Sequence, residues 1–164
     1  MPARTTRATL FLERMGIDYV LHEYVVAEKV GEGYGEAVAV AIGLPPGRVF
    51  KTLVVGVDEI HVVAVVPVSA RLSTRLLARA AGSKRAEMVA PAVAERLTGY
   101  VTGGISPFGQ KGSLDQYVDE SAVAYDTVAV SGGMRGIQLE VSPHDLVRVT
   151  NATVVTLVDD STHR

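Results

Sequence analysis

The chain has 164 residues and a formal net charge of −2 at pH 7. It contains no cysteine, which excludes disulfides, thiolate metal sites and a cysteine nucleophile. Hydrophobic residues make up 48% of the chain and charged residues 21%, which is close to ordinary globular usage and excludes a wholly disordered protein.

The mean hydropathy of +0.24 is high for a soluble protein, so we looked for a membrane-spanning segment. The apolar run over residues 60–68 is interrupted by His61 and is far shorter than the ~18 residues that a transmembrane helix needs. Glu13 and Arg14 interrupt the N-terminal region, so no signal peptide is predicted. We therefore expect a cytoplasmic protein without membrane association. The overall charge argues against a generally basic nucleic-acid-binding protein but leaves a local basic patch open.

The N-terminal half is predicted to mix short helices with a β-hairpin. Apolar residues at three- and four-residue steps predict a helix over residues 5–15, and alternation predicts a strand over residues 17–24. The segments that follow are a loop (27–33), a short helix (34–42), a turn (44–47) and a hairpin of two strands rich in β-branched residues (49–57 and 60–68).

The C-terminal half is predicted to continue this mixture. Ser73 is a suitable cap for a helix that ends near Ala81, and Ser142 followed by Pro143 is a typical helix start. The other predicted elements are a helix (91–97), a glycine-rich segment (99–112), two strands (127–131 and 137–141) and a last strand (152–158). Because helices and strands do not alternate regularly, the pattern favours one α+β domain with a central sheet or open barrel.

A lysine interrupts an apolar strand face at position 51. Alternate side chains of a strand share a face, so Lys51 shares one with valines and a leucine. Such a lysine either lies near the strand end and extends its ammonium to water, or is held in a cavity for a purpose. Lys51 is therefore a candidate functional residue, with a solvated lysine as the alternative.

The glycine-rich segment over residues 99–111 is a candidate anion-binding loop. Gly104 and Gly109 have the spacing of a Walker A motif, but Gln110 stands where that motif needs lysine, so we reject an NTPase. Adjacent glycines followed by Ser106 and Pro107 instead suit a rigid loop whose backbone N–H groups hold an anion or a developing oxyanion. A purely structural glycine-rich turn is the alternative.

A second glycine-rich turn begins at Ser131. No sequence signature links this serine to a histidine base, so a serine nucleophile has no support, and a structural hairpin is the alternative. The histidines lack metal-ligand spacing, so no metal site is predicted. They are His22, His61, His144 and His163.

A basic run follows the hairpin. Arg71, Arg75 and Arg79 are spaced by four residues in a predicted helical region that contains no acidic residue. This pattern is a candidate contact for a nucleic-acid backbone, and an ordinary solvated helix face is the alternative.

Four segments together match a known pattern: residues 22–24, 49–53, 99–111 and 131–136. They resemble, in order and over nearly the whole chain, the YbaK/EbsC family of aminoacyl-tRNA editing domains. The resemblance implies one α+β domain over residues 1–164, with a mixed, barrel-like β-sheet flanked by short helices. It also implies a free-standing hydrolase that removes a wrongly attached amino acid, chiefly Cys, from tRNA(Pro), which prolyl-tRNA synthetase mischarges.

The resemblance also implies roles for individual residues. Lys51, Gly103 and Ser131 fall on catalytic positions, and Gly103 is the backbone glycine that meets the substrate carbonyl. The implied substrate-binding residues are Tyr24, Tyr34, Thr52, Gly104, Ile105, Ser106, Pro107 and Gln138. Gln138 replaces an Asp that is frequent in Cys-specific members, and its neutral amide holds no negative charge. Removal of another small amino acid, such as Ala, therefore stays an alternative, as does a non-catalytic tRNA- or synthetase-binding module of the same fold.

The implied reaction uses no cofactor and no metal. An aminoacyl ester is already reactive, so positioning and oxyanion stabilisation supply the catalysis. Either the thiol of a Cys substrate or a bound water attacks the carbonyl carbon. The expected partners are mischarged tRNA, most of all tRNA(Pro), and prolyl-tRNA synthetase.

Overall fold

The computed structural model describes residues 4–27 and 29–159, so His163 and both ends of the predicted domain lie outside the described residues. The helices are α1 (Arg7–Arg14), α2 (Tyr34–Ile42), α3 (Thr74–Ala80), α4 (Pro91–Thr98) and α5 (Pro143–Thr150), with short 3-10 segments at Pro46–Arg48 and Glu120–Ala124. The strands are β1 (Val20–Glu23), β2 (Phe50–Val57), β3 (Ile60–Pro67), β4 (Ala86–Met88), β5 (Asp115–Asp119), β6 (Val128–Ser131), β7 (Ile137–Val141) and β8 (Thr153–Val155).

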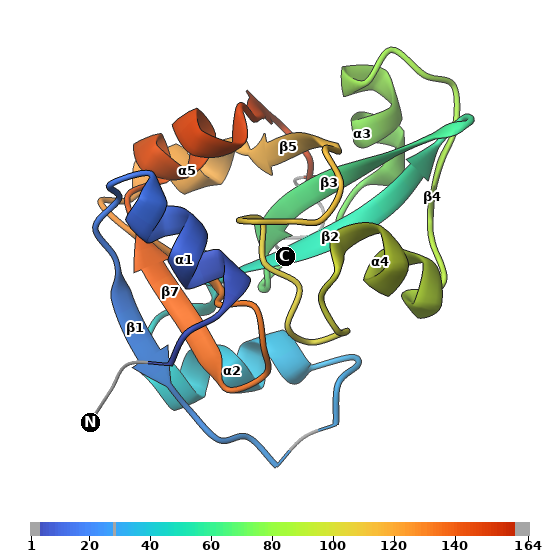
Figure 1. Cartoon of the computed structure of the whole chain (residues 1–164). Helices are drawn as coiled ribbons and strands as arrows, with labels where there is room; N and C mark the ends of the chain where they lie inside the picture. Colours follow the sequence, from blue (N-terminus) through green and yellow to red (C-terminus); the bar gives the residue numbers. More distant parts are fainter. Residues whose placement is uncertain (1–3, 28, 160–164) are drawn as a thin grey trace.

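The strands form two sheets (Figure 1). A three-stranded antiparallel sheet has the order β1-β7-β6, and a five-stranded mixed sheet has the order β4-β2-β3-β5-β8. In the larger sheet β3, β5 and β8 are parallel, while β4, β2 and β3 are antiparallel. An isolated parallel bridge between Val49 and Ala129 links the two sheets. The predicted α+β class with a mixed sheet is confirmed, but the strands form two linked sheets instead of one barrel-like sheet.

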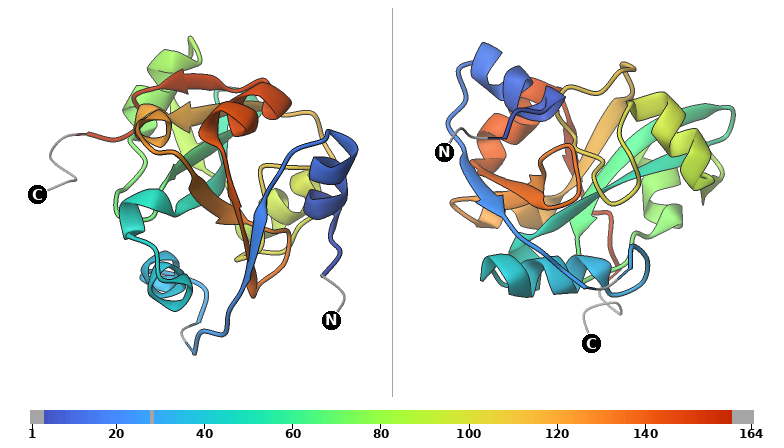
Figure 2. Two further views of the ribbon diagram at one scale, coloured as in Figure 1. Left: turned by 90° about the vertical axis from the view of Figure 1, so that its left-hand side faces the viewer. Right: turned by 60° about the horizontal axis from the view of Figure 1, so that its bottom comes forward.

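The two sheets share a hydrophobic core. Phe50, Val63 and Val65 of the larger sheet lie in one buried cluster with Ile137 and Leu139 of the smaller sheet. Helices α1 and α5 add apolar side chains to this cluster, and they lie on the side of the molecule away from α3 and α4 (right-hand view of Figure 2). Burial of each such side chain contributes about 1.5–3 kcal/mol to folding. This core fixes the relative position of β2, β6 and β7, which line the cavity of the candidate site.

A second cluster covers the other face of the larger sheet. It contains Val55, Val57 and Val66 from the hairpin, Leu77 from α3, and Leu157. In the C-terminal half of β2, Val54 on one face and Val55 and Val57 on the other are all buried, which explains the nearly continuous apolar sequence of the strand.

The predicted hairpin is confirmed, and an aspartate makes its turn. Asp58 takes φ 52, in the left-handed region that glycine or asparagine usually occupies. Its carboxylate accepts hydrogen bonds from the backbone N–H groups of Lys84 and Arg85, at 3.4 and 3.2 Å. These bonds join the tip of the hairpin to the segment that leads into β4.

The helices begin where the capping residues predict. Ser73 accepts a hydrogen bond from the Leu76 N–H at the start of α3, and Ser142 accepts one from the Asp145 N–H at the start of α5. Helix α2 has the predicted bounds, whereas α1, β1 and β8 are shorter than predicted. Within the described residues, no helix has the length and apolar character that crossing a membrane requires.

Candidate functional site

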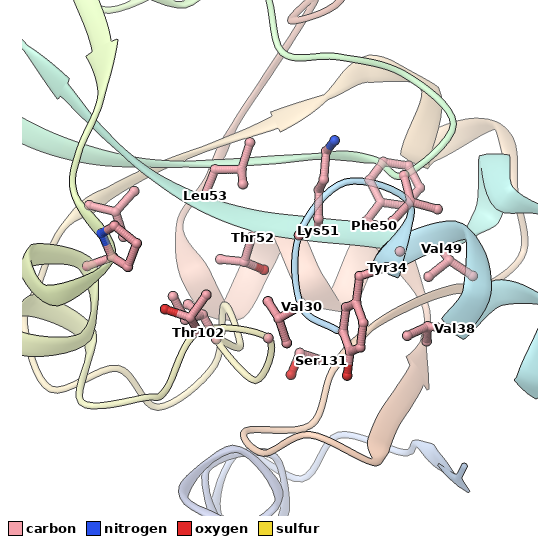
Figure 3. Close-up of a pocket in the computed structure, with 18 of the residues that line it drawn as sticks. Val30, Tyr34, Val38, Val49, Phe50, Lys51, Thr52, Leu53, Thr102 and Ser131 are labelled. Atoms are coloured by element: carbon pink, nitrogen blue, oxygen red, sulfur yellow. The ribbon is translucent and has the colours of Figure 1, made fainter. Parts of the chain in front are cut away.

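A cavity of about 300 Å³ lies beside the first half of β2 (Figure 3). Its walls come from β2, the start of α2, the loop after α4, and the facing ends of β6 and β7. The lining is mainly apolar and includes Val30, Val38, Val49, Phe50, Leu53, Met88 and Val89. This volume is at the lower end of small-molecule sites, so it suits a small ligand.

The cavity exists because the two sheets separate along β2. Strand β3 pairs with the whole of β2, but β4 pairs only with Val55 to Val57, and the ladder to the smaller sheet among the described residues is the single bridge at Val49, just before β2. The outer edge of β2 between these points has no strand partner among the described residues. The Val49 carbonyl accepts the Val68 N–H on the β3 side, so strand alternation directs the Thr52 N–H and C=O to the open edge. The site therefore offers backbone as well as side-chain hydrogen-bonding groups.

Two buried polar side chains in the cavity wall have unused acceptors. The Thr52 Oγ1 and Gln138 Oε1 atoms are buried and have no hydrogen-bond partner in the described part of the chain. Gln138 lies on β7 directly opposite Ser131 on β6, and the Ser131 Oγ accepts the Gly133 N–H at 3.3 Å. A buried acceptor without a donor costs about 1–3 kcal/mol, so these atoms indicate where a ligand places its donors.

Lys51 borders the cavity but directs its amine elsewhere. In Figure 3 the Lys51 side chain extends away from Ser131, whereas Thr52 extends toward the cavity. The Lys51 side chain also lines a neighbouring depression together with Glu36 and Arg71. Burial lowers the pKa of Lys51, Glu36 opposes this shift, and Arg71 adds to it. The ammonium is thus a half-buried positive charge at the rim.

Tyr34 lines the cavity from the first turn of α2. Burial raises the pKa of its hydroxyl to about 12, and the neighbouring Tyr24 hydroxyl acts in the same direction. Tyr34 therefore stays a neutral hydrogen-bond donor at physiological pH. Tyr24 is buried behind Tyr34 and does not line this cavity.

The loop after α4 brings Thr102, Gly103 and Ile105 to the cavity. Gly103 has φ +88, and a Cβ there would lie 2.7 Å from the Val30 Cγ2 atom and 3.0 Å from the Arg135 Nε atom. Only glycine fits both the backbone conformation and this close approach. The structure thus brings Tyr34, Lys51, Thr52, Gly103, Ile105, Ser131 and Gln138 together at one cavity, as the sequence predicts.

Gly104, Ser106 and Pro107 do not line the cavity, in contrast to the prediction. The Ser106 Oγ accepts the Phe108 N–H at 3.2 Å, and the Pro107 carbonyl accepts the Gln116 amide at 2.8 Å. Gly104 packs on the Met134 backbone, where a Cβ would lie 2.8 Å from the Met134 Cα. These residues hold the shape of the loop that presents Gly103.

The three arginines do not share one helix face. Arg71 precedes the Ser73 cap of α3, so the predicted helical position of Arg71 is wrong. Arg75 and Arg79 lie one turn apart on α3. Arg71 forms an exposed ion pair with Glu32 at 3.6 Å, and Arg75 pairs with Asp159 at 3.1 Å.

Several cavity residues had no signal in the sequence. Val30 lies in a segment predicted only as a loop, and Met88 and Val89 lie in or beside β4, which was not predicted. Over residues 4–27 and 29–159, no group of three or more His, Cys, Asp or Glu side chains is arranged to hold a metal ion.

Comparison with known proteins identifies the family. The model of the aminoacyl-tRNA editing domain matches residues 33–149, which include the cavity-lining parts of α2, β2, the loop after α4, β6 and β7. The chain belongs to the aminoacyl-tRNA editing domain family. This membership confirms the resemblance that the sequence motifs indicate.

Relatives from bacteria extend over nearly the full chain. A protein of Enterococcus faecalis that bears the name of a Cys-tRNA(Pro)/Cys-tRNA(Cys) deacylase, EbsC, is 38% identical over 89% of this chain and 88% of its own length. The multifunctional Ser/Thr-tRNA deacylase ProXp-y of Escherichia coli is 29% identical over 91% of this chain and 89% of its own. A crystal structure described as a trans-editing enzyme for prolyl-tRNA synthetase superposes with a TM-score of 0.80 at 26% identity, covering 93% of this chain and 95% of that one. These editing-domain relatives differ in the amino acid that their names give.

Proposed function

We propose that residues 1–164 form one trans-editing domain that hydrolyses the ester between a small, wrongly attached amino acid and the terminal ribose of tRNA. Cys on tRNA(Pro), supplied in error by prolyl-tRNA synthetase in the cytoplasm, is the proposed main substrate. Membership of the editing family and the relative named for this reaction support this choice. A neutral Gln138 in the wall keeps Ala, Ser or Thr as alternative amino acids.

The observation that carries the proposal is the pair of unused acceptors, Thr52 Oγ1 and Gln138 Oε1, in a cavity of about 300 Å³ that Gly103 also lines. The α-ammonium group of an esterified amino acid supplies donors for such acceptors. Apolar walls then surround a small side chain. An ester carbonyl placed between these groups lies within reach of the loop that carries Gly103.

The chemistry needs little activation. A nucleophile attacks the carbonyl carbon, the carbonyl oxygen becomes an oxyanion, and the bond to the ribose oxygen breaks as that oxygen takes a proton. In the water route, the product is the free amino acid. In the thiol route, the Cys sulfur attacks, and water opens the cyclic thioester afterwards. In both routes the Gly103 N–H stabilises the oxyanion, and holding the reacting groups in position contributes ~7–11 kcal/mol.

Lys51 has a different role in this scheme. Its ammonium lies at the rim, next to the depression that Glu36 and Arg71 line. A strongly hydrated point charge at a rim suits the phosphate of the terminal nucleotide. Lys51 therefore binds the tRNA end while the cavity holds the aminoacyl group.

The test is release of amino acid from a panel of purified Cys-, Ser-, Thr-, Ala- and Pro-tRNA(Pro), with Mg²⁺ present only to fold the RNA. We expect rapid release of one small amino acid and slow release of Pro. Thr52→Val keeps the side-chain shape but removes the acceptor, so kcat/KM should fall about 10–100-fold, the worth of a hydrogen bond to a charged group. Thr153→Val, at an exposed position of β8, is the matched control and should behave as wild type.

Two outcomes would contradict the proposal. If the protein bound tRNA but released no amino acid from any aminoacyl-tRNA, it would be a non-catalytic binding module of the same fold. If Thr52→Val were as active as wild type, the cavity beside β2 would not be the site where the ester is hydrolysed.

A further inference from the structure

Thr102 is held from two directions: Glu95 binds its N–H and hydroxyl, and Arg135 binds its carbonyl, which belongs to the Thr102–Gly103 peptide. The Glu95 Oε2 atom accepts hydrogen bonds from the Thr102 N–H at 2.8 Å and from the Thr102 hydroxyl at 2.9 Å. From a different segment, the Arg135 Nε–H donates to the Thr102 carbonyl oxygen at 2.8 Å. Glu95 belongs to α4, and Arg135 to the turn between β6 and β7. Thr102 itself lies at the cavity wall (Figure 3).

The turn that contains this peptide does not fix its orientation alone. The Gly104 N–H donates to the Val101 carbonyl at 2.8 Å, which closes a β-turn with Thr102 and Gly103 at its centre. The φ of +88 at Gly103 is that of a type II turn. A type I turn has the central peptide flipped and φ near −90° at the same position, and glycine adopts both values readily. An additional contact is therefore needed to select one orientation.

The orientation decides where the Gly103 N–H points. In a trans peptide the C=O of one residue and the N–H of the next lie on opposite sides of the bond. Arg135 holds the Thr102 carbonyl, so the Gly103 N–H points away from Arg135. This N–H makes no hydrogen bond within the described part of the chain. Gly103 lines the cavity and Arg135 does not.

We propose that Glu95 and Arg135 are positioning residues that direct the Gly103 N–H into the cavity, where it stabilises the oxyanion of the ester. Arg135 holds the Thr102–Gly103 peptide itself, and Glu95 anchors the N–H and side chain of Thr102 at the start of the same turn. The proposal rests on the proposed deacylase function. A flip of this peptide would replace the N–H by the Thr102 carbonyl oxygen, which repels an oxyanion. Neither Glu95 nor Arg135 lines the cavity, so both act through the loop.

Glu95 is in the protonation state that accepts both hydrogen bonds. The hydrogen bonds from the Thr102 backbone and hydroxyl lower the pKa of Glu95, and Arg135 acts in the same direction. Glu95 is thus a carboxylate at neutral pH and accepts both bonds. The contact with Arg135 is exposed, so its removal leaves the core intact.

The test compares variants that remove a hydrogen bond with variants that keep it. Arg135→Met retains the aliphatic stem that packs on Gly103 but loses the donor, and Glu95→Ala loses the acceptor. Each should lower kcat about 10–100-fold with little change in KM, because loss of an oxyanion donor costs 10²–10³-fold and the flip is partial. Glu95→Gln keeps an oxygen acceptor and should stay within about threefold of wild type, because the hydrogen bonds and not the charge set the orientation. The double variant should be no worse than about the more severe single variant, since both residues act on one turn through Thr102.

Matched controls come from exposed positions elsewhere. Glu13 on α1 accepts a hydrogen bond from the Tyr19 hydroxyl at 2.9 Å, so Glu13→Ala removes a comparable hydrogen bond far from the cavity. Arg148→Met removes a guanidinium on α5 that pairs with Asp145 at 3.2 Å. Both controls should keep wild-type kcat.

A second readout does not depend on activity. The ¹H–¹⁵N signal of the Gly103 amide should be a single sharp peak in wild type and in Glu95→Gln. It should shift or broaden in Arg135→Met and Glu95→Ala, because the peptide then exchanges between two orientations. If wild type is active, and Arg135→Met and Glu95→Ala both keep the wild-type kcat and the wild-type Gly103 signal, the positioning role is wrong. Wild type without activity would instead refute the proposed function, and the Gly103 signal would still report whether the two side chains hold the peptide.

Discussion

Lys51 and Thr52 are neighbours in the sequence, but their side chains leave β2 in opposite directions (Figure 3). Thr52 extends into the cavity near Ser131, whereas Lys51 extends toward the depression that Glu36 and Arg71 line. Alternation along a strand makes this separation unavoidable. One strand therefore presents a neutral acceptor to the cavity and a positive charge to the depression beside it.

This arrangement predicts a substrate-dependent effect of Lys51→Ala. Deacylation of tRNA should fall at least ~100-fold, a loss of ~2.7 kcal/mol in transition-state stabilisation at 1.36 kcal/mol per decade. Hydrolysis of a small aminoacyl ester without a phosphate should change much less, because the rim charge has nothing to bind. Steady-state kinetics on both substrates measures the difference. A well-folded variant with normal tRNA turnover would make Lys51 an ordinary solvated lysine.

Lys51 should also cost the protein stability. Burial lowers its pKa in the folded protein below the value of 10.5 that the unfolded chain has. The folded state therefore binds this proton more weakly than the unfolded state does. The resulting loss in the free energy of unfolding is complete at pH values below the pKa of Lys51 in the folded protein. It declines as the pH rises from the folded pKa toward 10.5, above which the amine is neutral in both states. We expect Lys51→Met to raise the free energy of unfolding at pH 7, with a gain that shrinks as the pH approaches 10.5.

Urea denaturation of wild type and Lys51→Met at several pH values between neutral and alkaline tests this trend. Lys84→Met, at an exposed lysine, corrects for the general effect of losing one positive charge. A gain that stays constant with pH after this correction would show that the buried charge is not its cause.

Much of the fold could be predicted because local signals decide it. The caps at Ser73 and Ser142, the β-branched hairpin and the bounds of α2 all depend on residues close in sequence. Strand β5 was missed because its sequence is polar, although Gln116 and Asp119 are buried. The Gln116 Nε2 donates to the Pro107 carbonyl, and Asp119 accepts the Leu157 N–H, so hydrogen bonds to other segments hold both side chains in the interior.

In the candidate site too, some features could be predicted from local sequence motifs, whereas others depend on contacts between distant segments. Thr52, Gly103, Ser131 and Gln138 could be named from motifs, and the fold brings them to one cavity. Sequence reasoning could not separate the glycine-rich loop into Gly103, which lines the cavity, and Ser106 and Pro107, which support the loop from behind. It also gave no sign of Glu95, because the contact with Thr102 depends on how α4 meets the loop.

Gly104 tests the support of that loop. A methyl group at position 104 would lie 2.8 Å from the Met134 Cα, and backbone cannot move aside as a flexible side chain can. Gly104→Ala should lower the free energy of unfolding by about 1–3 kcal/mol, as overpacking does. At Gly56 the nearest atom to a new Cβ is 3.7 Å away, so Gly56→Ala is the control and should be within about 0.5 kcal/mol of wild type. Chemical denaturation measures both, and equal stability of the two variants would contradict the close packing at Gly104.

The nature of the attacking group can be tested with Ser-tRNA(Pro). If the substrate thiol attacks, Ser should be released at least ~10-fold more slowly than Cys, because a hydroxyl is almost wholly protonated near neutral pH while a thiol is a few per cent thiolate. The two side chains differ by one atom and are similar in size, so we expect their binding to differ little. Single-turnover rates separate binding from chemistry. Comparable rates for the two would indicate attack by water.

The last prediction concerns tRNA docking on α3. Arg75 and Arg79 lie one turn apart on this helix and are exposed, so they suit two phosphate groups of the RNA. Changing both to Glu should weaken tRNA binding and raise KM. It should also flatten the salt dependence of binding, by roughly 0.7 for each phosphate of a single-stranded end that is no longer neutralised. Hydrolysis of a small aminoacyl ester should not change, because that ester reaches the cavity without α3.

The double variant should remain folded, because the Arg75–Asp159 pair is exposed and such pairs contribute only about 0–1 kcal/mol. Arg148→Glu on α5, on the other side of the molecule in Figure 1, changes the net charge by half as much as the double variant and should keep its tRNA affinity. A salt titration distinguishes the two effects, since removing an arginine that binds a phosphate changes the slope whereas a general charge effect mainly shifts the curve. An unchanged slope and affinity in the double variant would eliminate α3 as the docking surface and leave the charges at the rim, Lys51 and Arg71, to bind the RNA.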